Sequence, residues 1–148
     1  MVLEGSGGDL QLDHIGIVVA DIERGCETFG SLLGRLEWTR RFDDTGLGVS
    51  VRFARDSTGI VYEIIAPLTQ TSPVARALQS RANLLNQLAY RTTSLEPTVK
   101  RLRAHGSVPV GRPAPAVAFG GARVQFLMTP LGFLIELIEI DRVVHDFG

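Results

Sequence analysis

The sequence is poor in cysteine and has no long apolar segment. Its single cysteine, Cys26, excludes an intrachain disulfide and lies at helical spacing with Ile22 and Phe29, as a core residue would. No apolar run approaches the roughly 20 residues that cross a bilayer. Residues 1 to 8 lack the basic and apolar regions of a signal peptide. We therefore expect a cytoplasmic protein without a membrane partner.

The sequence also has no excess of charge of one sign. Its 148 residues include 15 basic and 16 acidic ones, for a net charge of −1. A nucleic-acid-binding domain would carry a basic stripe, so this balance argues against a nucleic-acid partner. A chain of this length with 45% hydrophobic residues can bury one substantial core.

The chain repeats itself after 73 positions. Residues 12 to 19 form an apolar strand pattern that is followed by Asp21, a good helix N-cap. Residues 86 to 91 repeat the strand and Ser94 repeats the cap. Six later pairs are identical at the same shift: Gly48 and Gly121, Val51 and Val124, Phe53 and Phe126, Gly59 and Gly132, Glu63 and Glu136, and Ile65 and Ile138. Because no insertion is needed, the pattern indicates an internal duplication.

Each half is predicted to be a βαβββ module. Apolar periodicity and turn residues place the elements of the first half as strands at 11–19, 36–42, 48–54 and 60–66 and a helix at 21–33. A short helix at 73–79 follows, and the second copy has its helix at 94–105. The expected fold class is α+β, with two tandem βαβββ modules forming a curled mixed sheet around a cleft.

The domain organisation follows from the repeat. We expect a flexible N-terminus at 1–10, one domain at 11–140 made of the repeats 11–67 and 85–140, and a tail at 141–148 that trails at the surface with His145. Residues 111 to 121 are rich in proline, glycine and alanine, and we expect no regular element there. A loop this apolar either packs as a rim on its own domain or covers a ligand as a lid.

Two glutamates lie inside otherwise apolar strands. Glu63 is flanked by Tyr62 and Ile64, and Glu136 by Ile135 and Leu137. Burying an unpaired carboxylate is costly, so such a residue either faces water at a strand edge or has a compensating partner. Because both glutamates occupy the same position of the repeat, we interpret them as a compensated pair.

Strand alternation brings four polar side chains into the cleft: His14, Glu63, Gln87 and Glu136. The set offers one imidazole, one amide oxygen and two carboxylates, and a divalent cation would bring its formal charge to zero. These donors suit Zn, Ni, Co, Mn or Mg better than a thiolate-seeking ion. Four protein ligands on a six-coordinate ion leave two positions for neighbouring oxygens of a substrate.

The paired modules, the Asp13-His14-Ile15-Gly16 opening and the two glutamate-bearing strands resemble the vicinal oxygen chelate superfamily. This superfamily includes glyoxalase I, methylmalonyl-CoA epimerases, extradiol dioxygenases and bleomycin-resistance proteins. The resemblance covers residues 11 to 140 and is nearest to bacterial glyoxalase I-like and methylmalonyl-CoA epimerase-like proteins. It implies the same four metal ligands. Gln87 departs from the nearer relatives, in which histidine is usual.

The resemblance implies a metal-dependent lyase or isomerase of the glyoxalase type. Such an enzyme acts on a small carbonyl or thioester substrate through a metal-stabilised enediolate, with Glu136 or Glu63 as the catalytic base. Two alternatives stay open: a non-catalytic, resistance-type protein that binds a small molecule, and an acyl-CoA epimerase. Epimerases are expected to use a second carboxylate base, which falls here on Val51, a residue that cannot move a proton. Extradiol dioxygenases need two histidines, and only His14 is available.

The remaining lining of the cleft is apolar with one cation. The predicted substrate-binding residues are Val51, Phe53, Arg91, Phe119, Val124, Phe126 and Met128. Arg91 either meets an anionic group of the substrate or forms a salt bridge at the surface. The resemblance also implies a homodimer, and the sequence leaves open whether the cleft lies within one chain or between two.

Overall fold

The first βαβββ module forms as predicted, except that its second strand is divided. The computed structural model describes residues 10–79 and 85–148, so the predicted flexible N-terminus lies, up to residue 9, outside the described residues. The elements are β1 (Gln11–Val18), α1 (Ile22–Leu33), β2 (Glu37–Trp38), β3 (Phe42–Asp44), β4 (Val49–Arg55) and β5 (Val61–Pro67). The strand predicted at 36–42 is thus two short strands, β2 and β3, which both pair with β4.

The second module repeats this order after a short linking helix. The linking helix is α2 (Pro73–Gln79). The elements of the second module are β6 (Leu85–Thr92), α3 (Leu95–Ala104), β7 (Val108–Pro115), the 3-10 helix η1 (Val117–Phe119), β8 (Arg123–Met128) and β9 (Leu134–Glu139). Asp21 caps α1 as predicted, because its side chain accepts a hydrogen bond from the Arg24 backbone. None of the described helices is long and apolar enough to cross a membrane.

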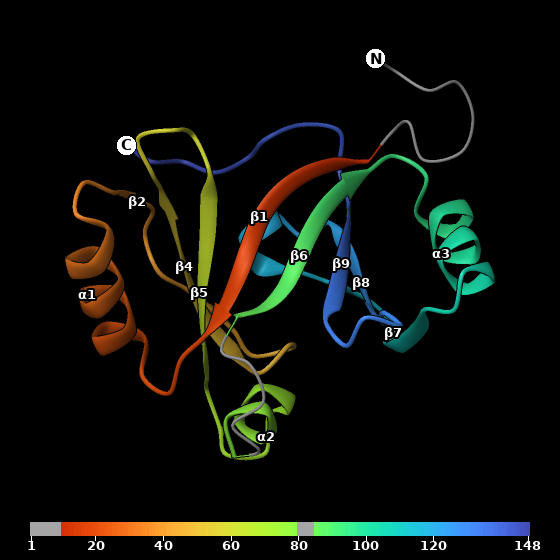
Figure 1. Cartoon of the computed structure of the whole chain (residues 1–148), viewed down its shortest axis with the longest axis horizontal. Helices are drawn as coiled ribbons and strands as arrows, with labels where there is room; N and C mark the ends of the chain where they lie inside the picture. Colours follow the sequence, from red (N-terminus) through yellow and green to blue (C-terminus); the bar gives the residue numbers. More distant parts are fainter. Residues whose placement is uncertain (1–9, 80–84) are drawn as a thin grey trace.

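All the strands in the described part of the chain belong to one curled mixed sheet (Figure 1). Its order is β2-β4-β5-β1-β6-β9-β8-β7, with β3 paired to β4 off this path. The two modules meet where β1 pairs antiparallel with β6, whereas β1 pairs parallel with β5 and β6 parallel with β9. The predicted α+β class is confirmed, and both modules of the sheet come from one chain.

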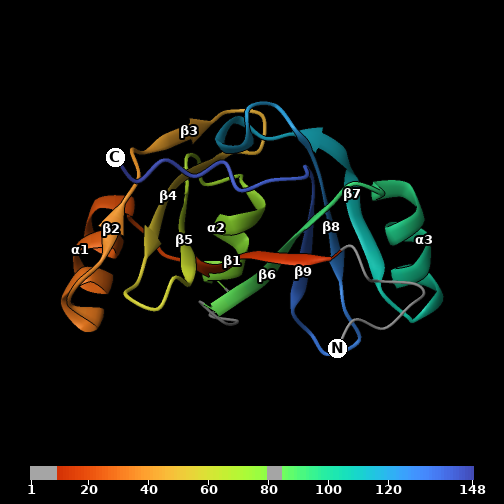
Figure 2. The ribbon, with the colours of Figure 1, turned by 90° about the horizontal axis from the view of Figure 1, so that it is seen from above.

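Helices α1 and α3 lie on the face of the sheet opposite the main core, whereas α2 packs against that core through Val74 and Leu78. Helix α1 packs through Ile22 and Cys26 against Ile64, and α3 packs through Leu95 against Leu127, so the two helices flank the sheet on its outer side. The concave side holds the main core, formed by residues of both modules: Val18, Val49, Val51, Phe53, Ile65, Ala89, Ala116, Phe119, Val124 and Ile138. Seen from above, η1 and the C-terminal segment lie across this concavity (Figure 2).

The prediction of no regular element at 111–121 is wrong. Residues 111 to 115 belong to β7, and 117 to 119 form η1. Strand β7 tolerates its prolines because it lies at the edge of the sheet, and its register with β8 shifts between Val110 and Ala114. Proline and glycine content therefore marked an irregular edge strand here rather than a loop.

Candidate functional site

The four predicted ligands come from four adjacent strands at the centre of the sheet. In the strand register, Gly16 of β1 lies beside Glu63 of β5 on one side and beside Gln87 of β6 on the other. Two residues away along these strands, Ala89 of β6 lies beside His14 of β1 and beside Glu136 of β9. Each module thus places a small residue between two polar ones, which leaves room for the polar side chains to converge on the concave side.

The side chains of these four residues meet in a buried cluster. The Nε2 atom of His14 lies 3.2 Å from Glu63 Oε1 and 3.3 Å from Glu136 Oε1. Gln87 Nε2 donates hydrogen bonds to the same two oxygens, at 3.3 and 3.0 Å. The exposed fractions are 1% for His14, 6% for Glu63, 6% for Gln87 and 4% for Glu136. The sequence prediction that these four residues meet is borne out by the distances, while their role as ligands stays a prediction.

Gly16 provides the space that Gln87 occupies. A Cβ atom added at Gly16 would lie 2.3 Å from Gln87 Cγ and 2.8 Å from its Cδ. We expect Gly16→Ala to push the Gln87 amide out of the cluster and to weaken Co²⁺ binding about tenfold, a typical cost for disturbing a metal site. Isothermal titration with Co²⁺ measures this change. Gly30→Ala, which meets only Trp38 at 3.8 Å, is the control, and an unchanged affinity in Gly16→Ala would exclude Gln87 as a ligand.

Asp13 is a fifth member of the cluster, which strand alternation had placed on the opposite face. The register of β1 against β6 shifts between Leu12 and His14, so Asp13 and His14 are both buried although they are neighbours in the strand. His14 Nδ1 donates to Asp13 Oδ2 at 2.7 Å. This bond fixes the imidazole so that its Nε2 atom faces the two glutamates, as the outer carboxylate of a histidine metal ligand does.

Two further side chains hold Asp13. His145, from the C-terminal segment, donates from Nε2 to Asp13 Oδ2 at 2.7 Å, and Arg91 Nε lies 3.2 Å from Asp13 Oδ1. The prediction that His145 trails at the surface is therefore wrong, since its side chain is 2% exposed. His145 lies outside the repeat, so it has no counterpart in the other module that could have drawn attention to it. Its hydrogen bond to Asp13 and its ring contacts with Phe53 and Phe119 keep it inside.

Burial and the neighbouring charges shift the pKa values of three residues in the cluster. Burial opposes a charge on Asp13, but hydrogen bonds from His14 and His145 hold the pKa of this carboxyl well below its ordinary value of 3.8. Burial likewise lowers the pKa of His14, yet the charge of Glu63 and the hydrogen bond to Asp13 outweigh it and raise that pKa well above 6.5. Burial raises the pKa of Glu136, to which repulsion from Glu63 adds. The cluster thus favours a cation at its centre.

The residues fit a divalent metal ion. Two ligand atoms that each lie about 2.1 Å from an ion and subtend a right angle are about 3 Å apart. The contacts of His14 Nε2 and of Gln87 with the glutamate oxygens, at 3.0 to 3.3 Å, have this spacing. His14 Nε2 is buried without an aligned hydrogen bond, and His14, Glu63 and Glu136 form a cluster that can hold a metal. Rotating the Gln87 amide turns its oxygen to the centre.

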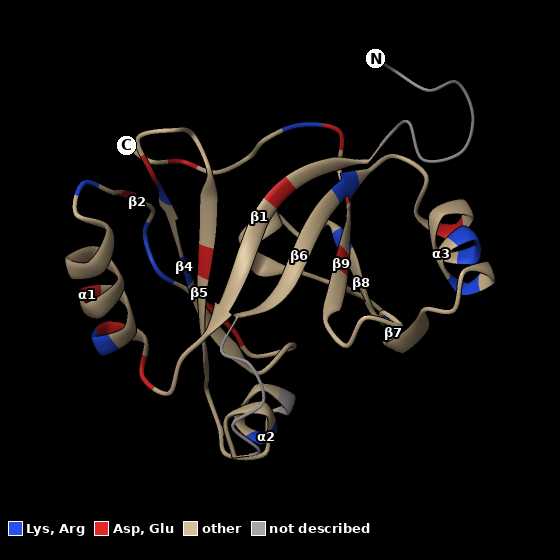
Figure 3. Cartoon of the chain, viewed as in Figure 1, with Lys and Arg blue, Asp and Glu red and all other residues tan. Residues whose placement is uncertain are grey.

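The net charge supports the same conclusion. Figure 3 shows acidic residues on β1, β5 and β9 and a basic one on β6, in strands that are otherwise mostly uncharged. Arg91 lies beside Asp13 and compensates it, which leaves the two charges of Glu63 and Glu136 to a cation. In a metal-free protein the proton of His14 supplies part of this compensation, and a bound ion would displace it, because a metal ligand must be deprotonated.

The predicted substrate-binding residues lie at different depths. Val51, Phe53, Phe119 and Val124 are buried in the concave core, and Phe126 packs against it. The Phe119 ring stacks on His14 at 5.8 Å, and the Phe53 ring meets His14 edge-on at 5.3 Å. Met128, at the end of β8, is 40% exposed. Arg91 is turned to Asp13 and its side chain is 12% exposed.

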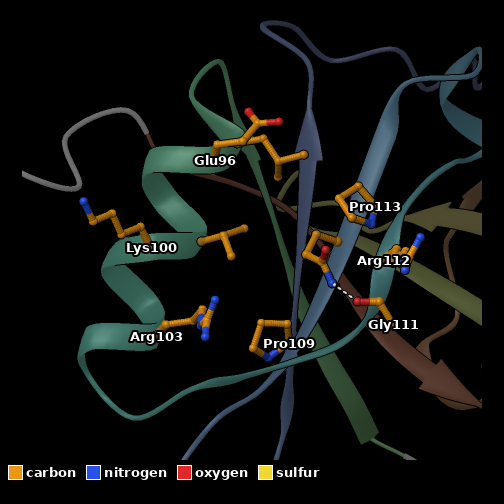
Figure 4. A pocket seen from close by; sticks show the side chains of 10 residues that line it. Glu96, Lys100, Arg103, Pro109, Gly111, Arg112 and Pro113 are labelled. Carbon is orange, nitrogen blue, oxygen red and sulfur yellow. Dashed lines mark hydrogen bonds between the residues drawn. The ribbon is translucent and has the colours of Figure 1, made fainter.

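A separate groove of about 630 Å³ lies on the side of the sheet that α3 covers (Figure 4). Its walls include Glu96, Lys100 and Arg103 of α3 and Pro109 and Arg112 of β7. None of the predicted site residues lines it. The groove is therefore not part of the cluster around His14.

Comparison with known proteins gives a family and a set of similar structures. The family model of the Glyoxalase/Bleomycin resistance protein/Dioxygenase superfamily matches residues 13–126. The sequence matches no curated protein.

Among solved structures, a hypothetical protein from Bacillus halodurans C-125 is 26% identical, with a TM-score of 0.76 over 93% of this chain and 99% of that one. Methylmalonyl-CoA epimerase from Mycobacterium tuberculosis is 28% identical, with a TM-score of 0.73 over 93% and 91% of the two chains. A variant of Streptomyces coelicolor methylmalonyl-CoA epimerase in complex with 2-nitronate-propionyl-CoA is 22% identical, with a TM-score of 0.72 over 88% and 94%.

Proposed function

Because the chain belongs to the Glyoxalase/Bleomycin resistance protein/Dioxygenase superfamily, we propose that it is a metal-dependent lyase or isomerase of the glyoxalase type. The observation that carries this proposal is the buried cluster in which His14, Glu63, Gln87 and Glu136 face one another within 3.3 Å. A divalent ion held by these four residues would bind two neighbouring oxygens of a carbonyl or thioester substrate and stabilise the negative charge that forms when the adjacent carbon loses a proton.

We propose Glu136 as the group that transfers the proton, with Glu63 as the alternative. Burial raises the pKa of the Glu136 carboxyl in the metal-free protein. His14 is kept in one orientation by Asp13. Gln87, whose Nε2 donates to both glutamates in this structure, would turn its amide oxygen to a bound ion. The rings of Phe53 and Phe119 exclude water from this centre, which strengthens the electrostatic interactions within it.

A metal-binding assay tests this proposal first. We expect Ni²⁺ at 100 times its dissociation constant to stabilise the protein by about 2.7 kcal/mol, which raises Tm by about 5–10 °C in a chain of this size. Thermal unfolding of protein stripped with EDTA, together with elemental analysis of protein purified without added metal, measures this. Glu139→Gln, at the end of the same strand where the side chain is 31% exposed, should keep the shift, and Glu63→Gln should lose most of it.

The opposite result points to another function. If neither Ni²⁺, Co²⁺, Zn²⁺ nor Mn²⁺ stabilises the wild type, the metal-dependent mechanism is excluded, and a metal-free protein that binds a small molecule without chemistry becomes the better proposal.

Epimerisation of an acyl-CoA is a second candidate, favoured by the similarity to the epimerase of Mycobacterium tuberculosis over 93% of the chain. Val51 argues against it. This residue stands where the resemblance places the second carboxylate base, and it is 5% exposed within the apolar core. Two measurements on methylmalonyl-CoA test this candidate. Deuterium incorporation from D₂O shows whether the protein exchanges the proton on the α-carbon. Optical rotation shows whether it also inverts the configuration of that carbon.

A further inference from the structure

The C-terminal segment 141–148, here called the strap, crosses the concave side of the sheet above the metal-ligand cluster. It leaves β9 in the second module and runs over β5 and β4 of the first (Figures 1 and 2). Val144 and Phe147 pack against the concave core, and the guanidinium of Arg55 lies 4.4 Å from the centre of the Phe147 ring. The strap therefore covers the site with side chains of its own.

Few contacts attach the strap to the sheet. Among the described residues, no main-chain hydrogen bond joins 141–148 to a strand, and the hydrogen bond from His145 to Asp13 is its polar attachment. Ring contacts add to the packing of Val144 and Phe147: His145 lies 4.2 Å from Phe53 and 5.4 Å from Phe119, measured between ring centroids. Asp141, Arg142, Val143 and Asp146 are exposed.

The other cover of the site is held more firmly. The segment around η1, which carries Phe119, is folded on itself by main-chain hydrogen bonds such as the one from the Phe119 amide to Ala116. Strands β7 and β8 hold its two ends through the pair Pro115 and Arg123, and the Val117 amide donates to Asp44 Oδ2 at 2.9 Å. This segment can therefore leave only with the loss of strand pairing, whereas the strap has no such pairing among the described residues.

The buried site requires an opening. His14 is 1% exposed, and its ring is enclosed by Phe53, by Phe119 and by His145 of the strap, so neither an ion nor a substrate reaches the cluster in this conformation. If the strap leaves, Asp13 keeps its hydrogen bond to His14 and its contact with Arg91, so the opening does not leave a buried charge without a partner.

We propose that the strap is a displaceable lid, latched by His145 on Asp13, which opens to admit the metal ion and the substrate. The part of this proposal that concerns the ion rests on the proposed function. A lid of this kind changes the rates at which the site fills and empties, whereas the affinity for the ion changes little, because the strap supplies none of the four predicted ligands.

Cobalt binding kinetics in the 148-residue chain test the lid. We expect His145→Ala and, separately, Phe147→Ala to accelerate Co²⁺ entry and Co²⁺ release to EDTA about tenfold each in stopped-flow absorbance, with a dissociation constant that changes less than threefold. Val143→Ala, a change at an exposed position of the strap, should behave as the wild type. Equal entry rates in the wild type and in both latch variants would overturn the proposal.

Trypsin cleavage provides a second measurement that needs no metal. The side chain of Arg142 is 76% exposed, but the protease must draw the surrounding strap into its active site, so cleavage after Arg142 requires the strap to lift. We expect His145→Ala and Phe147→Ala to raise this cleavage rate about tenfold without changing the rates at other arginines. If Co²⁺ binds to none of the proteins, the proposed function fails, and unchanged cleavage after Arg142 in both variants then overturns the lid as well.

Discussion

Replacing Glu136 by glutamine should lower the rate of α-proton exchange about 1000-fold, within the range that a general base contributes. Glutamine keeps the size of the side chain but can neither accept the proton nor supply the negative charge that faces His14. The rate is measured as deuterium incorporation from D₂O, at saturating Ni²⁺, into methylmalonyl-CoA and into the hemithioacetal that methylglyoxal forms with a thiol.

Two variants control this experiment. Glu139→Gln lies three residues further along β9, pairs with Arg123 at the surface, and should exchange the proton at the wild-type rate. Glu63→Gln should bind Ni²⁺ more weakly but, once saturated, should lose less of the exchange rate than Glu136→Gln. A larger loss in Glu63→Gln would assign the base to Glu63 instead.

Asp13→Ala should lower the free energy of unfolding by about 3–5 kcal/mol at pH 7, the usual cost of removing one member of a buried charged network. Asp13 is the shared partner of His14, Arg91 and His145, and its side chain is 1% exposed. Without it, the Arg91 guanidinium stays largely buried with no counter-charge. Urea unfolding of the metal-free protein measures the difference. Asp43→Ala, which removes an exposed partner of Arg41, should leave the midpoint nearly unchanged.

The contribution of Asp13 to the free energy of unfolding should decrease in strong acid. The pKa of Asp13 in the folded protein lies below its ordinary value of 3.8, so its contribution to stability is complete above that value and is lost as the pH falls through the folded pKa. The difference between wild type and Asp13→Ala should therefore shrink as the pH falls below 3.8. A difference that grows on acidification below this value would mean that Asp13 is protonated in the folded protein.

Most of what was predicted correctly about the fold and the four polar residues came from the repeat in the sequence. Because Gln87 and Glu136 follow His14 and Glu63 at one constant shift, a residue that looks ordinary alone becomes one of four that share a position in two modules. The same regularity predicted the order of strands and helix in each module. Alternation along a strand then sufficed to bring the four side chains to one side of the sheet.

The features that sequence reasoning missed are the irregular ones. Asp13 joins His14 because the register of β1 shifts there, and nothing in an alternating pattern announces such a shift. His145 is brought in by ring contacts with Phe53 and Phe119, residues more than 20 positions away, so no local pattern predicts its burial. The prolines of β7 were misread because an edge strand does not need every backbone N–H.

The two halves of the site match in shape but differ in charge, and this difference has a stereochemical consequence. The pair Asp13 and His14 stands in one module where Asn86 and Gln87 stand in the other. A planar carbon that has lost its proton and is bound between two identical modules would have two equivalent faces. A proton would then add to either face. Here one flank offers a charged imidazole–carboxylate pair and the other a neutral amide, so the two faces are inequivalent. We expect a product formed at this site to have a single handedness.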